Sequence, residues 1–306
     1  MIRERAQEIE AENNRSLPQI TSTDSELKES GAWFESRDQL MTDENTQATL
    51  SYLQELATSC GYDLVKRKSE YSEDLATFPI KDIMRYGAFV AGGRGSGKSN
   101  LLKLLVRECL RGKVEVKLKI FDPSLTWKNF PLPKLRVTSE NLEVVSEWNH
   151  IYDISRLSVL HARKFVSRML SNDLQEAIAY TDIGKTQKGL IIIEEAQNII
   201  PSHSLRSMKF AEISRFLTQG RNFDLSFVAS TQRLASCDIN LVEVSGIKYW
   251  FRMSGHRNIV KTRFWLSKYE TWNLRNLEIG SCYLQCGSKI KLLKLPLFSI
   301  EQVIAK

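Results

Sequence analysis

The stretch AGGRGSGKSNLLKLLV, from Ala91 to Val106, decides how the chain folds. The part from Gly92 to Ser99 fits the phosphate-loop pattern G-x-x-x-x-G-K-[ST] at every required position. An apolar run, residues 86–91, precedes it, and leucines at helical spacing follow it, so a buried strand, a glycine loop and a helix are expected in succession. Such a loop directs backbone N–H groups and a helix N-terminus at one anion. The stretch therefore predicts a nucleotide-phosphate site rather than a glycine-rich turn that matches by chance.

Each position of the loop has an expected role. The Lys98 ammonium is expected to reach the β- and γ-phosphates of a nucleoside triphosphate, and the Ser99 hydroxyl is expected to bind Mg²⁺. The other positions supply backbone N–H groups in conformations that glycine adopts easily. The nucleotide-binding candidates are Gly92, Gly93, Arg94, Gly95, Ser96, Gly97, Lys98, Ser99 and Asn100.

Beyond residue 86 the sequence alternates between strand-like and helix-like segments. Such alternation predicts an α/β fold, with a mostly parallel sheet covered by helices on both faces. The last pair of strands is expected to form a hairpin that turns at Gly287 and Ser288. The expected strands are 86–91, 114–122, 150–155, 188–195, 224–233 and 246–254 with the hairpin 280–296, and the expected helices are 100–110, 159–180 and 210–222.

Two consecutive acids end the apolar run LIIIEEAQ, residues 190–197. Glu194 is placed to support the metal, a task that more often falls to aspartate, and Glu195 is placed to polarise the attacking water. The alternative is a strand that simply turns polar at the surface, which is the weaker reading beside a complete phosphate loop. Gln232, at the end of FVASTQR, is a candidate sensor of the γ-phosphate, with a simple strand cap as its alternative.

The blocks GGRGSGKS, IIIEEAQNIIP and TQGRNFDLSFVASTQR, in this order and spacing, resemble the HerA/FtsK superfamily of DNA-pumping ATPases. FDPS at Asp122 and IYDIS at Asp153 are similar to strand ends of that superfamily, and the likeness covers roughly residues 80–296. Glu194 departs from the aspartate of many relatives. The resemblance implies a RecA-like P-loop core of the ASCE type, ATP and Mg²⁺ as cofactors, and a hexameric ring around duplex DNA.

In such a ring the ATP site lies between subunits and needs a cation from the neighbour. The resemblance makes Arg221 in QGRN one candidate, and Lys248 and Arg252 in GIKYWFRM two others. Each has an ordinary alternative as a surface or salt-bridged cation, and the sequence does not rank them.

The charge of the chain is uneven. Residues 1–80 hold 8 Lys+Arg and 16 Asp+Glu, whereas residues 81–306 hold the other 35 basic and 20 acidic residues. We therefore expect an acidic, mostly helical and partly disordered extension over 1–78 and a basic motor domain over 79–306. A basic motor is compatible with sequence-independent binding of double-stranded DNA. Arg206 and Lys209 are candidates for contacts in the pore, and a solvated helix start is an equally good interpretation of them.

The expected function is ATP-driven translocation of double-stranded DNA. The plan of an extension and a motor resembles the packaging ATPases of membrane-containing icosahedral DNA viruses, which implies a capsid vertex or a membrane-associated portal as a further partner. Five scattered cysteines and no visible signal peptide or membrane span favour the cytoplasm. The alternatives are a plasmid-transfer or HerA-like DNA-processing ATPase, and an NTP-dependent switch or scaffold that does not translocate.

Overall fold

The computed structural model describes residues 79–112, 115–143, 146–205 and 207–299 in full, and the backbone of residue 206. The extension expected over 1–78 lies outside these residues. The described helices are α4 (Ile80–Tyr86), α5 (Lys98–Arg111), α6 (Val159–Asp182), α7 (Ala196–Ile199), α8 (Ala211–Gln219), α9 (Ile239–Val244), α10 (His256–Thr262) and α11 (Lys268–Asn273). The described strands are β1 (Ala88–Ala91), β2 (Lys117–Asp122), β3 (Lys134–Arg136), β4 (His150–Asp153), β5 (Gly189–Ile193), β6 (Leu225–Thr231), β7 (Ile247–Phe251), β8 (Ser281–Cys286) and β9 (Lys289–Lys294).

Within the described residues, the strands form one sheet in the order β3-β4-β2-β5-β6-β1-β7-β8-β9. Every pair from β3 to β7 is parallel, and β8 and β9 complete the sheet as antiparallel strands. The predicted α/β class and the C-terminal hairpin are therefore confirmed. Among the described helices, none combines the length and apolarity that crossing a bilayer requires.

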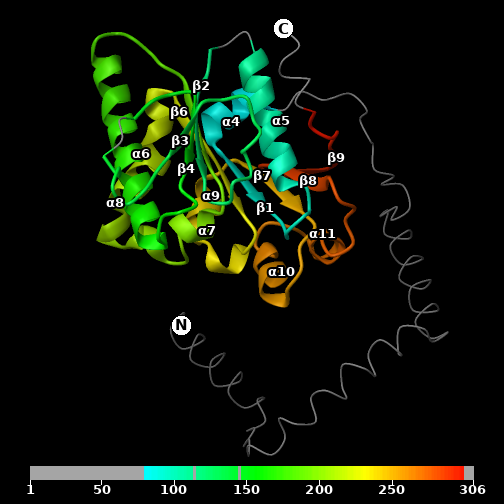
Figure 1. Ribbon diagram of the computed structural model, residues 1–306. Coiled ribbons are helices and arrows are strands. Elements are labelled where there is room, and N and C mark those ends of the chain that lie inside the picture. Colours follow the sequence, from blue (N-terminus) through cyan, green and yellow to red (C-terminus); the bar gives the residue numbers. More distant parts are fainter. Residues whose placement is uncertain (1–78, 113–114, 144–145, 300–306) are drawn as a thin grey trace, which may run out of the picture. The chain divides into compact units, whose positions relative to one another are not determined.

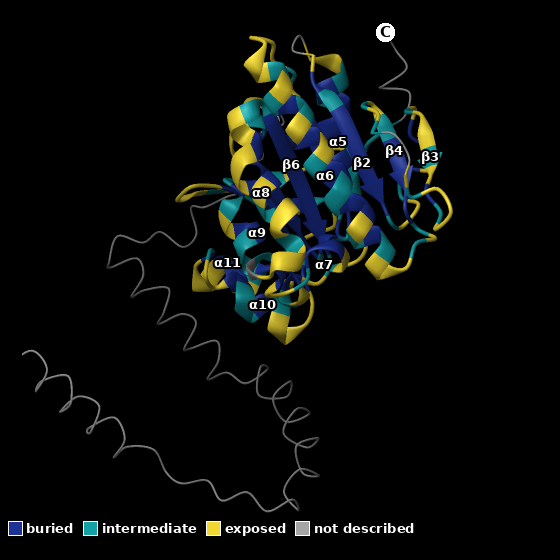
Figure 2. Ribbon diagram, turned by 90° about the vertical axis from the view of Figure 1, so that its left-hand side faces the viewer, coloured by how far each residue is buried: buried dark blue, intermediate teal, exposed yellow. Residues whose placement is uncertain are grey.

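The sheet is covered on both faces, as its parallel strands require (Figure 1). On β5, Leu190 and Ile192 face the core that holds the apolar residues of α5, whereas Ile191 and Ile193 face the core formed with α6 and α8. Strands β2 and β6 are buried almost throughout (Figure 2), although β2 carries Lys119 and β6 carries Ser226 and Ser230 among their apolar residues.

Several short elements were not predicted. Strand β3 has three residues, with Lys134 and Arg136 exposed, so it carries no apolar run. Helices α9, α10 and α11 have six or seven residues each, which is less than two helical turns. A helical spacing of apolar residues cannot be recognised in so short a segment.

Candidate nucleotide site

Three predicted parts of the site come together at one edge of the sheet. The phosphate loop follows β1, the acidic pair follows β5, and Gln232 follows β6. These strands are parallel neighbours in the order β5-β6-β1, so their carboxyl ends meet at the same edge. Ligands of open α/β sheets bind at this edge. The topology thus brings together the positions that the sequence predicts for binding and for hydrolysis.

The loop requires glycine at two of its positions. Gly97, at the start of α5, has φ of 113°, a conformation that side chains rarely adopt, and an added Cβ would lie 3.0 Å from the Gly280 Cα. At Gly92 an added Cβ would lie 2.5 Å from the Phe251 Cβ. The glycines therefore let the loop pack closely against β7 and the segment that precedes β8.

Neighbouring backbone groups fix the loop from outside. The Gly93 N–H donates to the Arg252 carbonyl at 2.7 Å, and the Gly280 N–H donates to the Ser96 carbonyl at 3.0 Å. Backbone groups held in this way do not need to reorganise when a ligand arrives, so the loop is preorganised for an anion.

Lys98 begins α5 and is buried, and its Nζ donates to the Gly93 carbonyl at 2.9 Å. Burial lowers the pKa of its ammonium, and the nearby carboxylates of Glu195 and Glu194 oppose that shift. A triphosphate that enters the loop would offer this ammonium stronger, negatively charged acceptors than a carbonyl.

Glu194 lies at the end of β5 beside Asp122, which ends the neighbouring strand β2. The Asp122 carboxylate accepts three backbone N–H groups, from Ser124, Thr126 and Trp127, at 2.9 to 3.1 Å. Glu194 is only 4% exposed, and burial, followed by the Asp122 charge, raises its pKa to about 7.

The residues at this edge fit a Mg²⁺ ion. Glu194 Oε1 is buried and has no hydrogen-bond partner among the described residues, an unfavourable state for a carboxylate oxygen unless a ligand completes it. Ser99 follows Lys98 in the first turn of α5 and would supply its hydroxyl. Carboxylate and hydroxyl oxygens are the hard donors that Mg²⁺ prefers.

Replacing Glu194 by glutamine is expected to stabilise the nucleotide-free protein at high pH. With a pKa near 7, this carboxyl binds more protons when folded than when unfolded, so its ionisation lowers the free energy of unfolding as pH rises from about 4.5 to about 7. Glu194→Gln should gain roughly 3 kcal/mol at pH 8 and less than about 1 kcal/mol near pH 5. Denaturant unfolding at both pH values measures this, with Glu140→Gln as an exposed control. An equal effect at both values would contradict the prediction.

Glu195 is the N-cap residue of α7 and has φ of 49°, a left-handed conformation that is uncommon for a residue with a side chain. Its Oε1 accepts a hydrogen bond from Gln232 Nε2, and its Oε2 accepts one from Gln197 Nε2 at 2.5 Å. The predicted base and the predicted sensor are thus in direct contact. Gln197 was not predicted as a site residue; its place two residues after the acidic pair was the available signal.

The Asn100 side chain has a different task in this structure from the predicted one. Its Nδ2 donates to the Pro296 carbonyl at 2.8 Å, and its Oδ1 accepts from the Phe298 N–H at 2.7 Å. Asn100 therefore holds the segment after β9 against α5. A role of Asn100 in nucleotide binding stays a prediction and would have to use its backbone.

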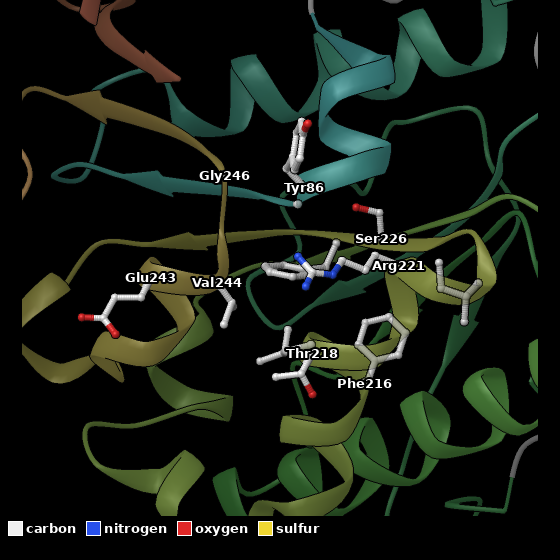
Figure 3. Close-up of a pocket in the computed structure, with 12 residues that line it drawn as sticks. Tyr86, Phe216, Thr218, Arg221, Ser226, Glu243, Val244 and Gly246 are labelled. Atoms are coloured by element: carbon white, nitrogen blue, oxygen red, sulfur yellow. The ribbon is translucent and has the colours of Figure 1, made fainter. Parts of the chain in front are cut away.

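Of the three candidate trans cations, Arg221 lies far from its own phosphate loop. It belongs to the 3-10 helix η5 (Gly220–Phe223), which precedes β6, whereas the loop lies beyond the carboxyl ends of the strands. The seven residues of β6 separate these edges by roughly 20 Å. The exposed Arg221 side chain points into a cavity of about 290 Å³ that Tyr86 and Ser226 also line, while Glu243 points away (Figure 3).

The other two candidates are placed differently. Lys248 is half-buried on β7, its Nζ donates to the Ser245 carbonyl at 2.6 Å, and burial lowers its pKa. Arg252 follows β7 directly beside its own phosphate loop, because its carbonyl accepts the Gly93 N–H. A cation that serves a neighbouring subunit has to be exposed and away from its own site, so this geometry favours Arg221.

The two candidates for pore contacts lie in the segment between α7 and α8. Arg206 ends the 3-10 helix η3 (Ser204–Arg206), and Lys209 is exposed in η4 (Met208–Phe210). Met208 beside it is 90% exposed. The Leu205 N–H donates to Asp238 Oδ2 at 2.9 Å, which fixes the base of the segment. Met208 and Lys209 are thus exposed on a segment whose start is fixed to Asp238.

No model of a known protein family and no curated protein sequence matches the chain. Among solved structures, it is similar to the genome packaging NTPase B204 from Sulfolobus turreted icosahedral virus 2 in complex with ATP-gammaS, with a TM-score of 0.52 and 16% identity over 69% of this chain and 97% of that one. It is also similar to VirB4 of Thermoanaerobacter pseudethanolicus, with a TM-score of 0.51 and 11% identity over 70% and 90%.

The chain therefore shares the α/β fold of these two structures, with the phosphate loop and an acidic pair at one edge of the sheet. At these identities the likeness establishes the fold, and the activity has to be argued from the residues of the site.

Proposed function

We propose that the protein is an ATP-driven translocase of double-stranded DNA that packages a viral genome into a capsid. The observation that carries the catalytic part is the Glu195 carboxylate, held by Gln232 at the same edge as the phosphate loop. A protein that only binds nucleotide has no use for a carboxylate fixed beside the expected γ-phosphate. This arrangement favours hydrolysis over the alternative of a switch or scaffold.

In the proposed reaction, backbone N–H groups of the loop and Lys98 bind the triphosphate, and Glu195 orients a water molecule. The water oxygen forms a bond to the γ-phosphorus while the bond from this phosphorus to the β–γ bridging oxygen breaks, and ADP leaves with that electron pair. The water proton passes to Glu195 and then to solvent, so the products are ADP and phosphate. Mg²⁺, held through Ser99 and Glu194, would neutralise charge on the phosphates.

We propose that the active protein is a ring of subunits. Arg221 has an exposed side chain, and the length of β6 places it roughly 20 Å from the ATP site of its own subunit. It is therefore suited to stabilise transition-state charge at the site of a neighbouring copy. A hexamer, as in the resembling superfamily, lets every site receive one such cation.

The chain is almost equally similar in structure to the viral packaging NTPase and to VirB4, because the two TM-scores differ by 0.01. Packaging is favoured because the matched region spans 97% of the viral NTPase, which leaves almost no part of that enzyme without a counterpart. A capsid vertex or a portal in the viral membrane would then be the docking partner, and the host cytoplasm the location. A plasmid-transfer or HerA-like DNA-processing ATPase is the second candidate.

Duplex DNA is expected to raise the rate of ATP hydrolysis several-fold, whatever its sequence. Contacts to phosphates release counterions, so DNA affinity should fall by at least about tenfold between 50 and 200 mM salt. Lys209→Ala should weaken binding to all sequences equally, whereas Lys185→Ala, an exposed lysine beyond α6, should not. Hydrolysis assays and DNA titrations at both salt concentrations measure these effects. Hydrolysis indifferent to DNA would favour the switch.

A further inference from the structure

A chain of hydrogen bonds joins Glu195 to strand β6 through Gln197. Gln197 Nε2 donates to Glu195 Oε2 at 2.5 Å, and Gln197 Oε1 accepts from the Thr231 hydroxyl at 2.6 Å. Thr231 is fully buried at the end of β6, and its own carbonyl accepts the Gly92 N–H of the phosphate loop at 3.2 Å. The side chain of Gln197 therefore links the proposed base to the residue that holds the first glycine of the loop.

The donors in this chain determine which way the Gln197 amide points. The Thr231 hydroxyl accepts the Arg233 N–H at 3.1 Å, so its single proton is free to be donated elsewhere. The end of Gln197 that meets this proton has to be the amide oxygen, which leaves the NH₂ end for Glu195. A carboxylate needs donors, so both ends of the amide are matched to their partners.

The two glutamines that hold Glu195 are anchored differently. Gln197 is bound at both ends of its amide, whereas the bond to Glu195 is the only side-chain hydrogen bond of Gln232 in the described part of the chain. Gln232 can exchange its bond for one to a γ-phosphate. Gln197 cannot move without breaking two bonds, so Glu195 would stay held if Gln232 turned to a γ-phosphate, as its predicted sensor role requires.

We propose that Gln197 is a positioning residue for hydrolysis: with its orientation set by Thr231, it fixes the carboxylate of Glu195 toward the attacking water. This inference rests on the proposed ATP hydrolysis and on Glu195 as its base. Without Gln197 the carboxylate gains rotamers in which the water is not aligned, and misplacement by about 1 Å costs on the order of a hundredfold in rate. The amide of Gln197 is used by Glu195 and Thr231, so we expect binding of ATP not to depend on it.

The test compares ATP hydrolysis and ATP binding in variants of the full chain. Gln197→Met keeps the length of the side chain and removes both hydrogen bonds, and it should lower kcat roughly 10- to 100-fold with the Kd of ATP unchanged. Asn198→Ala, an exposed neighbour on α7, is the matched control and should leave kcat unchanged. In a Glu195→Gln background, Gln197→Met should cause no further loss, because the carboxylate that it positions is gone.

A second pair of variants tests the Thr231 hydroxyl, which orients Gln197. This pair keeps the inference testable if the Gln197→Met protein does not fold. Thr231→Val removes the hydroxyl and should lower kcat without changing the Kd of ATP, and Thr231→Ser should restore the rate because it restores the donor. An unchanged kcat in Gln197→Met, or the same loss in Thr231→Ser as in Thr231→Val, would overturn the inference and leave hydrolysis by Glu195 standing. A wild-type protein without hydrolysis, or one indifferent to Glu195→Gln, would overturn the proposed function and this inference together.

Discussion

Replacing Glu195 by glutamine is expected to lower the kcat of ATP hydrolysis by about 10²- to 10⁴-fold, the range for loss of a general base. Glutamine keeps the shape of the side chain but cannot take a proton from water. The loop groups that bind phosphate are untouched, so the Kd of ATP should stay within a few-fold of the wild-type value. Steady-state hydrolysis together with binding of a fluorescent ATP analogue measures the two effects separately.

The contrasting variant is Lys98→Ala. The Lys98 ammonium lies in the loop itself, beside the Gly93 carbonyl, so its removal should weaken ATP binding and hydrolysis together. If Glu195→Gln protein hydrolysed ATP at the wild-type rate, the assignment of Glu195 as the base would be wrong. If Lys98→Ala protein bound ATP normally, the loop would not be the phosphate site.

Mixing two inactive variants should restore part of the activity. Loss of a trans arginine costs about 10³- to 10⁵-fold in rate, so Arg221→Ala protein should be almost inactive alone. In a mixed ring, an intact Arg221 from a Glu195→Gln subunit meets an intact Glu195 of an Arg221→Ala subunit at some of the interfaces. Hydrolysis measured across mixing ratios should therefore rise above both parents and peak between them.

The same mixture with Lys248→Ala or Arg252→Ala protein identifies which cation acts in trans. Lys248 is bound to the Ser245 carbonyl and Arg252 lies beside its own loop, so neither mixture should behave as the Arg221 mixture does. Recovery with Lys248→Ala or Arg252→Ala in place of Arg221→Ala would move the role to that residue. No recovery in any mixture, with a monomer by light scattering under ATP and DNA, would contradict the ring.

The fold could be predicted to the extent that burial leaves a pattern in the sequence. Strand β5 is buried on both faces and is an apolar run, and the phosphate loop needs glycine for steric reasons that its spacing reveals. Strand β3 has only three residues, two of them exposed, so it produces no apolar run in the sequence. The order of strands could be foreseen only as mostly parallel, because pairing depends on long-range contacts.

The candidate site could be proposed from the sequence where chemistry demands a residue type, and less easily where a side chain acts through another. Lys98, Glu194 and Glu195 follow from what a triphosphate and its metal require. Gln197 stands in the quoted EEAQN block, yet its role depends on the distance to Thr231, which lies on another strand. Asn100 shows the converse, because its place next to the loop suggested a ligand and its amide is used by the segment after β9.

Displacement of a third strand from a DNA triplex tests the central claim, that ATP hydrolysis drives this protein along duplex DNA. A duplex carrying a labelled triplex-forming strand at one end is mixed with the protein, and release of the label is followed after ATP is added. We expect release with ATP whatever the sequence of the duplex track, and none with Glu195→Gln protein. Wild-type protein that hydrolyses ATP in the presence of duplex DNA without displacing the strand would contradict translocation.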